Sequence, residues 1–113
     1  MQYLVEMKLA DSGRSRSPEE GLSFIEQFVL PTLEVCKKLQ DEKKILAGGP
    51  VSGAIALTMV MRAESIQELD ELIESLPIWP RMETTVIPLT SFEGRMVAVR
   101  QILERLKAKL QTA

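Results

Sequence analysis

Two glutamates are the side chains of this sequence best placed to transfer protons. Glu6 lies in the segment QYLVEMKL and Glu83 in the segment METTVIPL. Both segments alternate in the way that predicts β-strands. A carboxylate held in a partly dry cavity has its charged form disfavoured, so it can act as a general base. We therefore take Glu6 and Glu83 as candidate catalytic residues. The alternatives are an ordinary ion pair of Glu6 with Lys8 or Arg62, and a solvated strand end for Glu83.

Four further side chains are candidates for holding a substrate. Thr85 shares a strand face with Glu83, and Thr58 and Arg62 share a face of the apolar segment 54–62. An arginine binds a carboxylate through two parallel hydrogen bonds, which would orient an anionic molecule. Arg62 can equally be an exposed strand terminus. Trp79, between Ile78 and Pro80, is expected either at a subunit contact or as the wall of a cavity.

The sequence contains no histidine and only one cysteine, Cys36. Imidazole catalysis and haem ligation by histidine are therefore excluded. Cys36 falls on the apolar stripe of a predicted helix, as expected of a small core residue. No acidic stretch has the spacing of a calcium loop. We expect neither a metal site nor a cofactor.

The amino-acid composition limits the kinds of partner that this protein is expected to bind. The 113 residues carry a net charge of −2, which gives no overall electrostatic signature of nucleic-acid binding. No segment is long and apolar enough to cross a bilayer, and no targeting segment is recognisable at the N-terminus. A single cysteine is compatible with a reducing compartment. We expect a cytoplasmic protein that binds neither nucleic acid nor membrane.

Hydrophobic periodicity predicts the elements that must position these side chains. The expected order is β-α-β-β-α-β-α, the split βαβ pattern of ferredoxin-like α+β folds, with an extra C-terminal helix. Pro31 is expected to kink or break the first helix near Leu30. Pro50 and a glycine pair predict an edge or bulged second strand. The predicted elements are a strand at 2–9, a loop at 10–17, a helix from Pro18 to about residue 39, strands at 45–51 and 54–62, a helix at 66–76, a strand at 82–89, a turn at 91–94 and a helix at 95–110.

The apolar content of the strands exceeds what two helices can cover. Both the segment 54–62 and part of 2–9 are apolar on two faces, whereas the helices lie on one face of a four-stranded sheet. A second copy of the chain is the simplest cover for the other face, so we expect a homodimer or higher homo-oligomer with sheets packed face to face. The last helix carries a seam that also needs a surface to pack on. That seam consists of Met96, Val99, Leu103, Leu106 and Leu110.

The segment LPIWPRMETTVIPL, residues 76–89, resembles the stretch that closes the fold of the muconolactone isomerase family. The opening strand YLVEM is similar as well, and the resemblance spans roughly residues 1–92. It implies a dimeric α+β barrel, with a core domain at 1–92 and the C-terminal helix, 93–113, outside it. The family carries histidine, tryptophan and arginine between the first helix and second strand, whereas residues 44–49 here read KILAGG.

The resemblance implies a small-molecule-binding protein, with isomerase-type proton transfer on a lactone or related anionic molecule by carboxylate acid–base chemistry. The alternative is a non-catalytic oligomeric binding or assembly module of the same fold. A cavity lined by Glu6, Thr58 and Thr85 would favour the first function. An interior closed by Leu4, Leu57, Val60 and Ile87 would favour the second. The sequence leaves both functions open, and with them whether the protein is an enzyme.

Overall fold

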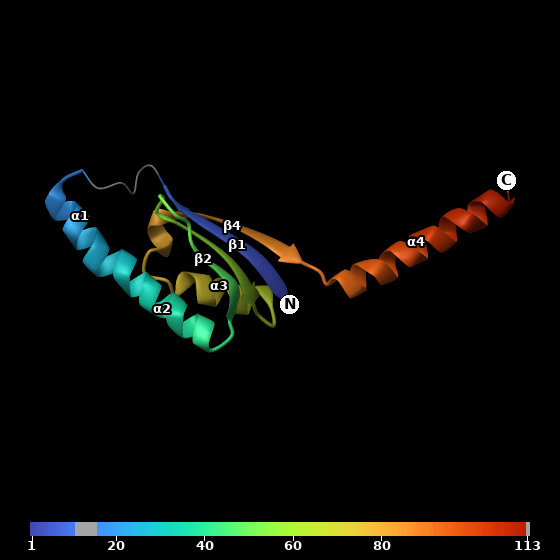
Figure 1. Cartoon of the computed structure of the whole chain (residues 1–113), viewed down its shortest axis with the longest axis horizontal. Coiled ribbons are helices and arrows are strands. Elements are labelled where there is room, and N and C mark those ends of the chain that lie inside the picture. The colour runs from blue at the N-terminus through green and yellow to red at the C-terminus, as the bar shows by residue number, and fades with distance from the viewer. Residues whose placement is uncertain (11–15, 113) are drawn as a thin grey trace.

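The computed structural model describes residues 1–10 and 16–112. It contains a four-stranded antiparallel sheet in the order β2-β3-β1-β4, with helices on one of its faces (Figure 1). This is the predicted α+β, ferredoxin-like arrangement. The elements are β1 (Gln2–Leu9), α1 (Pro18–Phe24), the π-helix η2 (Ile25–Val29), α2 (Leu30–Asp41), β2 (Ile45–Pro50), β3 (Ala56–Arg62), α3 (Ile66–Glu74), the 3₁₀-helix η3 (Trp79–Arg81), β4 (Met82–Leu89) and α4 (Phe92–Thr112). The predicted loop at 10–17 falls largely outside the described residues.

The first helix begins as the sequence predicts and continues past its proline. The Ser17 hydroxyl accepts a hydrogen bond from the Glu20 backbone N–H, and Pro18 occupies the first turn. Pro31 does not break the helix. The chain passes through the π-helical segment η2 immediately before α2, and the Leu30 N–H reaches the Ile25 carbonyl. A π-segment is one way for a helix to accommodate a proline that cannot donate a hydrogen bond.

The second strand is both an edge strand and bulged, as Pro50 and the glycine pair predict. Its register against β3 shifts between Ile45 and Ala47. Gly48 follows the shift with φ of 96°, and a Cβ there would collide with the Thr58 carbonyl oxygen. Only glycine fits this backbone position without strain. The bulge therefore depends on a close approach of two strands.

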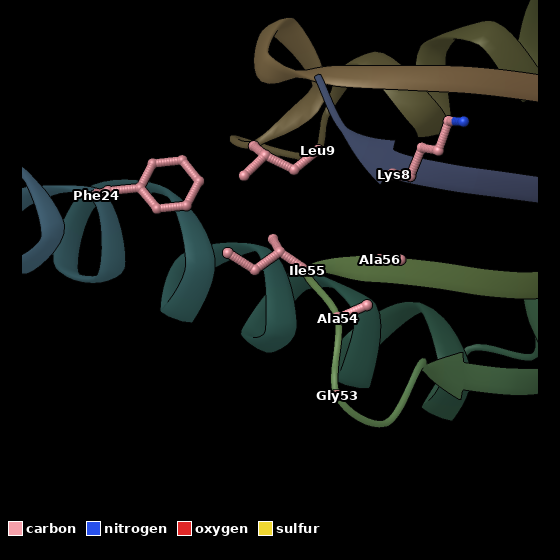
Figure 2. A pocket seen from close by; sticks show the side chains of 7 residues that line it. All are labelled: Lys8, Leu9, Phe24, Gly53, Ala54, Ile55 and Ala56. Carbon is pink, nitrogen blue, oxygen red and sulfur yellow. The ribbon is translucent and has the colours of Figure 1, made fainter. Parts of the chain in front are cut away.

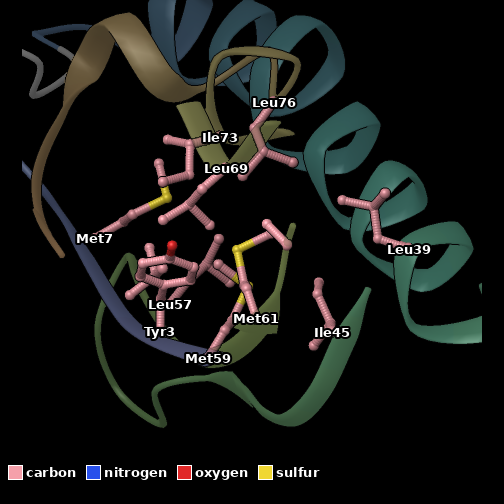
Figure 3. Packing of buried hydrophobic residues seen from close by; sticks show 12 residues of the cluster. Tyr3, Met7, Leu39, Ile45, Leu57, Met59, Met61, Leu69, Ile73 and Leu76 are labelled. Atoms are coloured by element: carbon pink, nitrogen blue, oxygen red, sulfur yellow. The ribbon is translucent and has the colours of Figure 1, made fainter. Parts of the chain in front are cut away.

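Alternate residues of β1 and β3 build the core. Their apolar side chains point from the sheet toward α2 and α3, where Leu39, Leu69 and Ile73 meet them (Figure 3). Methionine is abundant here because its unbranched side chain fills irregular gaps. The strand residues buried on this covered face are Tyr3, Val5, Met7, Leu57, Met59 and Met61.

The last helix projects from the body as an isolated arm (Figure 1). The molecule measures 73 × 30 × 25 Å, and α4 extends it along its longest axis (Figure 1). The helix begins at Phe92, so the predicted turn at 91–94 is wrong. The Ser91 hydroxyl accepts from the Gly94 N–H, which makes Ser91 a helix cap. All residues of the predicted seam, Met96, Val99, Leu103, Leu106 and Leu110, are exposed within the single chain.

Candidate functional site

The face of the sheet away from the helices, here called the open face, brings most of the predicted site residues together. Glu6 on β1 lies directly opposite Thr58 on β3 and Thr85 on β4. Directly opposed residues of antiparallel strands lie about 4.5–5.5 Å apart at Cα, and their side chains share a face. A carboxylate is therefore flanked by two hydroxyls in one row across the sheet, which we call the polar row.

The adjacent row toward the end of β1 adds charge. Lys8 pairs in register with Glu83 and Ala56, and its ammonium lies 3.6 Å from the Glu83 carboxylate. Both side chains are exposed, so the ion pair is weak and free to exchange partners. The sequence predicts Lys8 only as an ion-pair partner of Glu6. The i, i+2 spacing of Glu6 and Lys8 indicates that both side chains lie on one face of the strand. The register that pairs Lys8 with Glu83 cannot be seen in the sequence.

These two rows enclose a hollow of about 230 Å³ on the open face. That is smaller than the usual 300–1,000 Å³ of a complete ligand pocket. A hollow of this size fits part of a small molecule, or forms one side of a cavity that a second surface completes. Among the described residues, it is lined by Glu6, Met7, Lys8, Ala56, Leu57, Thr58, Glu83 and Thr85.

Arg62 and Trp79 lie elsewhere. Arg62 pairs in register with Gln2, four residues along β3 from Thr58 and so roughly 13 Å away at about 3.3 Å per residue. Trp79 begins η3, at the corner before β4, and is 37% exposed. Neither residue lines the hollow. Their predicted roles in substrate binding stay predictions.

An apolar row lies on the other side of the polar row. Leu4 is opposite Val60 on β3 and Ile87 on β4, and Ala47 of β2 extends the row. Leu57, expected in this set, is instead buried on the helix-covered face, because its position in β3 is odd relative to Val60. On the open face the apolar row therefore lies between the polar row and the row that contains Gln2 and Arg62.

A larger hollow of about 860 Å³ opens beside the site, at the end of the sheet (Figure 2). The side chains of Leu9 and Ile55 extend toward Phe24 of α1, while Lys8 points away from them. Lys8 and Ala56 line both hollows, so the two are adjacent. Among the residues that the structure describes, none that lines the larger hollow is a carboxylate, and we take this hollow as an approach to the site rather than as its centre.

Three side-chain contacts fix the corner from which β4 starts. The buried Thr32 hydroxyl of α2 accepts a hydrogen bond of 3.0 Å from the Ile78 N–H. The Arg81 guanidinium lies over the Phe28 ring at 4.7 Å and the Phe24 ring at 5.6 Å. These contacts tie the first helix to η3 and thereby set where Glu83 and Thr85 lie.

Other candidates are weaker. Burial raises the pKa of the half-buried Cys36 thiol, which disfavours the nucleophilic thiolate. Within 1–10 and 16–112, no three cysteine, aspartate or glutamate side chains gather in a way that could hold a metal ion. None of the described helices is both long enough and apolar enough to span a membrane.

The model of the muconolactone delta-isomerase family matches residues 1–94 of this chain. The chain belongs to the muconolactone delta-isomerase family. The match takes in all four strands and ends near the start of α4, so nearly all of the projecting arm lies outside it. A comparison with curated protein sequences finds no match.

Two solved structures share the fold of this family member. A crystal structure of muconolactone isomerase aligns with a TM-score of 0.64 and 24% identity, over 80% of this chain and 90% of the other. The 5-chloro-2-hydroxyhydroquinone dehydrochlorinase of Burkholderia phenoliruptrix AC1100, in complex with 2,5-dihydroxybenzoquinone, aligns with a TM-score of 0.58 and 21% identity, over 83% of this chain and 98% of the other. At these identities the likeness establishes the fold alone.

Proposed function

We propose that this protein binds a small anionic molecule, such as a lactone or a related ring acid, on the open face and transfers a proton on it. Glu6 is the base, Thr58 and Thr85 orient the substrate by hydrogen bonds, and Lys8 offers the positive charge. The observation that carries the proposal is the polar row, in which Glu6 lies between two hydroxyls and beside a second carboxylate, Glu83. Membership of an isomerase family supports it.

The open face also needs a second copy of the chain. Glu6 is exposed in the single chain, so it gains the dry surroundings that a base requires only when another surface closes the hollow. The apolar row of Leu4, Val60 and Ile87 is suited to packing against a partner sheet. We therefore place the site inside a homodimer. In this proposal residues 1–92 form the catalytic core, 93–113 are an appendage, and the protein acts in the cytoplasm.

The test is proton exchange rather than turnover of one substrate. Incubating the protein in D₂O with muconolactone, or with a simple butenolide, reports by NMR the exchange of the ring proton that is acidified through conjugation with the lactone carbonyl. A positioned base contributes about 10²- to 10⁴-fold, so Glu6→Gln is expected to lower the exchange rate by that factor. Net isomerisation of muconolactone is expected to be low, because residues 44–49 depart from the family. Exchange that survives Glu6→Gln unchanged would exclude Glu6 as the base.

The second candidate function, an assembly module without catalysis, is favoured by the apolar row. It predicts that Glu6→Gln changes neither exchange nor ligand-induced thermal stabilisation, while charges in the apolar row abolish assembly. Thr85→Val tests the polar row without changing its charge: the first function predicts weaker ligand binding, and the second predicts no change. The two functions therefore give opposite results at Glu6.

A further inference from the structure

The projecting helix α4 is a cationic amphipathic arm that packs on no other element among the residues the structure describes. Residues 92–113 contain five cations and two glutamates, for a charge of +3, whereas residues 1–91 contain nine cations and fourteen acidic groups, for a charge of −5. Its apolar side chains fall on one side at heptad spacing and are exposed. An apolar seam flanked by cations requires an apolar surface flanked by acids.

Such a surface lies along the first helical stretch. Leu22, Ile25, Leu30 and Leu33 are between 37% and 61% exposed, at i, i+3, i+8 and i+11. Leu33 also shares a small hollow with the exposed Ile55 of the β2–β3 hairpin. We call these five residues the acceptor stripe.

The charge around the acceptor stripe is the opposite of that on the arm. Residues 18–36 contain four glutamates and no lysine or arginine. Glu26 and Glu34, both exposed, are one residue from Ile25 and Leu33. Charge complementarity of this kind selects partners and orients them.

We propose that α4 of one copy docks on the acceptor stripe of a second copy, with its seam on the apolar side chains and its cations beside the glutamates. In the structure the arm points away from its own stripe. Leu89 pairs with Gln2 and Met82 with Leu9, so α4 leaves the sheet at one end while the hairpin and α1 lie at the other, roughly 24 Å away at about 3.4 Å per residue. Figure 1 shows the arm and α1 at opposite ends of the molecule.

Pairing of two arms with each other is disfavoured by the same charges. With Met96, Leu103 and Leu110 at one seam position and Val99 and Leu106 at the other, four cations flank the seam: Arg95, Arg100, Lys107 and Lys109. Two such helices would bring cation against cation at the positions that decide coiled-coil pairing. Docking of the arm on the acceptor stripe avoids this repulsion, because the charged residues around the stripe are glutamates.

Paired substitutions in the full chain test the surface. Leu103→Glu with Leu106→Glu is expected to raise the dissociation constant of the assembly at least tenfold by sedimentation velocity. Gln101→Glu with Ala108→Glu changes the charge equally on the opposite side of α4, and is expected to leave assembly nearly intact. An equal loss of assembly in both double variants would overturn the proposal, because the added negative charge alone would then explain the loss.

A mixed disulfide tests the partner. In a Cys36→Ala background, one chain carries Ile25→Cys and a second carries Leu103→Cys. These residues are near the midpoints of stripe and seam, so they meet whichever way the helix runs. The mixed dimer should form, and a Gln101→Cys chain should not replace the Leu103→Cys chain. Absence of the mixed disulfide, or a monomer whose arm binds phosphatidylserine vesicles, would overturn the proposal.

A charge exchange separates specific docking from general stickiness. Glu26→Lys with Glu34→Lys is expected to weaken assembly, as is Arg100→Glu with Lys107→Glu. Mixing the two altered chains should restore it, because the charges are again opposite. Failure of the mixture to exceed either altered chain alone would exclude the acceptor stripe.

Discussion

The two faces of the same four strands follow different rules. On the helix-covered face, alternate residues from Tyr3 to Met7 in β1 and from Leu57 to Met61 in β3 are hydrophobic and buried, with Val5 and Met61 at 0% exposure. On the open face, the intervening residues change character from row to row, from Leu4 and Val60 to Glu6 and Thr58. A uniform apolar face is what a fold needs, whereas a mixed face is half-suited to packing and half to ligands. The contrast indicates that the stability of the single chain resides mainly in the helix-covered face.

The largest expected difference between the faces is in the free energy of unfolding that is lost when each of two neighbouring residues is truncated. Met61→Ala leaves a cavity in the core and should lower the free energy of unfolding by about 2–5 kcal/mol. Val60→Ala removes half-buried methyl groups from the open face and should cost about 1 kcal/mol. Chemical denaturation measures both. Equal costs would mean that the open face is as tightly packed as the core.

A second comparison uses adjacent glycines in β2. Gly48→Ala forces an alanine to φ of 96° and brings its Cβ to 2.8 Å from the Met59 Cα, so it should cost roughly 1–3 kcal/mol or more. Gly49→Ala is the matched control, since a Cβ there meets nothing within 4 Å. Thermal melting of both variants measures the difference. A Gly48→Ala variant as stable as Gly49→Ala would show that the bulge can relax.

Much of this contrast between faces could be predicted from the sequence. The alternation of β1 and β4 predicted their bounds. It put Glu83 and Thr85 on one face of β4, as the alternation of β3 put Thr58 and Arg62 on one face of that strand. Strand alternation has a fixed period, so it assigns faces reliably. It does not assign position along a neighbouring strand, which depends on register. For this reason Arg62 shares a face with Thr58 but lies near Gln2, and Lys8 rather than Arg62 is the cation at the hollow.

The remaining errors arose where local signals compete. Ser91 and Gly94 resemble a turn, but the Ser91 hydroxyl caps a helix that begins at Phe92. The chain at Ala54 and Ile55 is apolar enough for a strand, yet Ile55 only accepts a hydrogen bond from the Leu9 N–H at the edge of the hairpin. In both places the outcome depends on which backbone groups find partners, and composition does not encode that.

Two adjacent threonines of β4 give a smaller test. The Thr84 hydroxyl is buried on the covered side and has no hydrogen-bond partner among the described residues. Thr84→Val should therefore be neutral or stabilise the protein by about 0.5–1 kcal/mol, because an unsatisfied hydroxyl is replaced by a methyl group. Thr85→Val on the open face should leave the melting temperature nearly unchanged and weaken ligand binding. A destabilised Thr84→Val variant would reveal a partner for that hydroxyl.

The smallest expected effect is the change in melting temperature when an ion pair beside one face or the other is removed. On the covered side, the Lys44 ammonium lies 2.9 Å from the Glu68 carboxylate, and this hydrogen bond, with a second from the Glu64 N–H, lowers the pKa of Glu68 below its ordinary 4.5. A carboxyl with a lowered pKa in the folded state contributes stability that is complete above its unfolded pKa and lost as pH falls through the folded one. The melting-temperature gap between the unaltered protein and Glu68→Gln should thus be constant near neutrality and shrink below about pH 4.5.

Glu83→Gln, which removes the exposed 3.6 Å pair with Lys8, should shift the melting temperature less at pH 7. A Glu68→Gln gap that persists unchanged at pH 3 would show that the contact at Lys44 depends on geometry rather than charge.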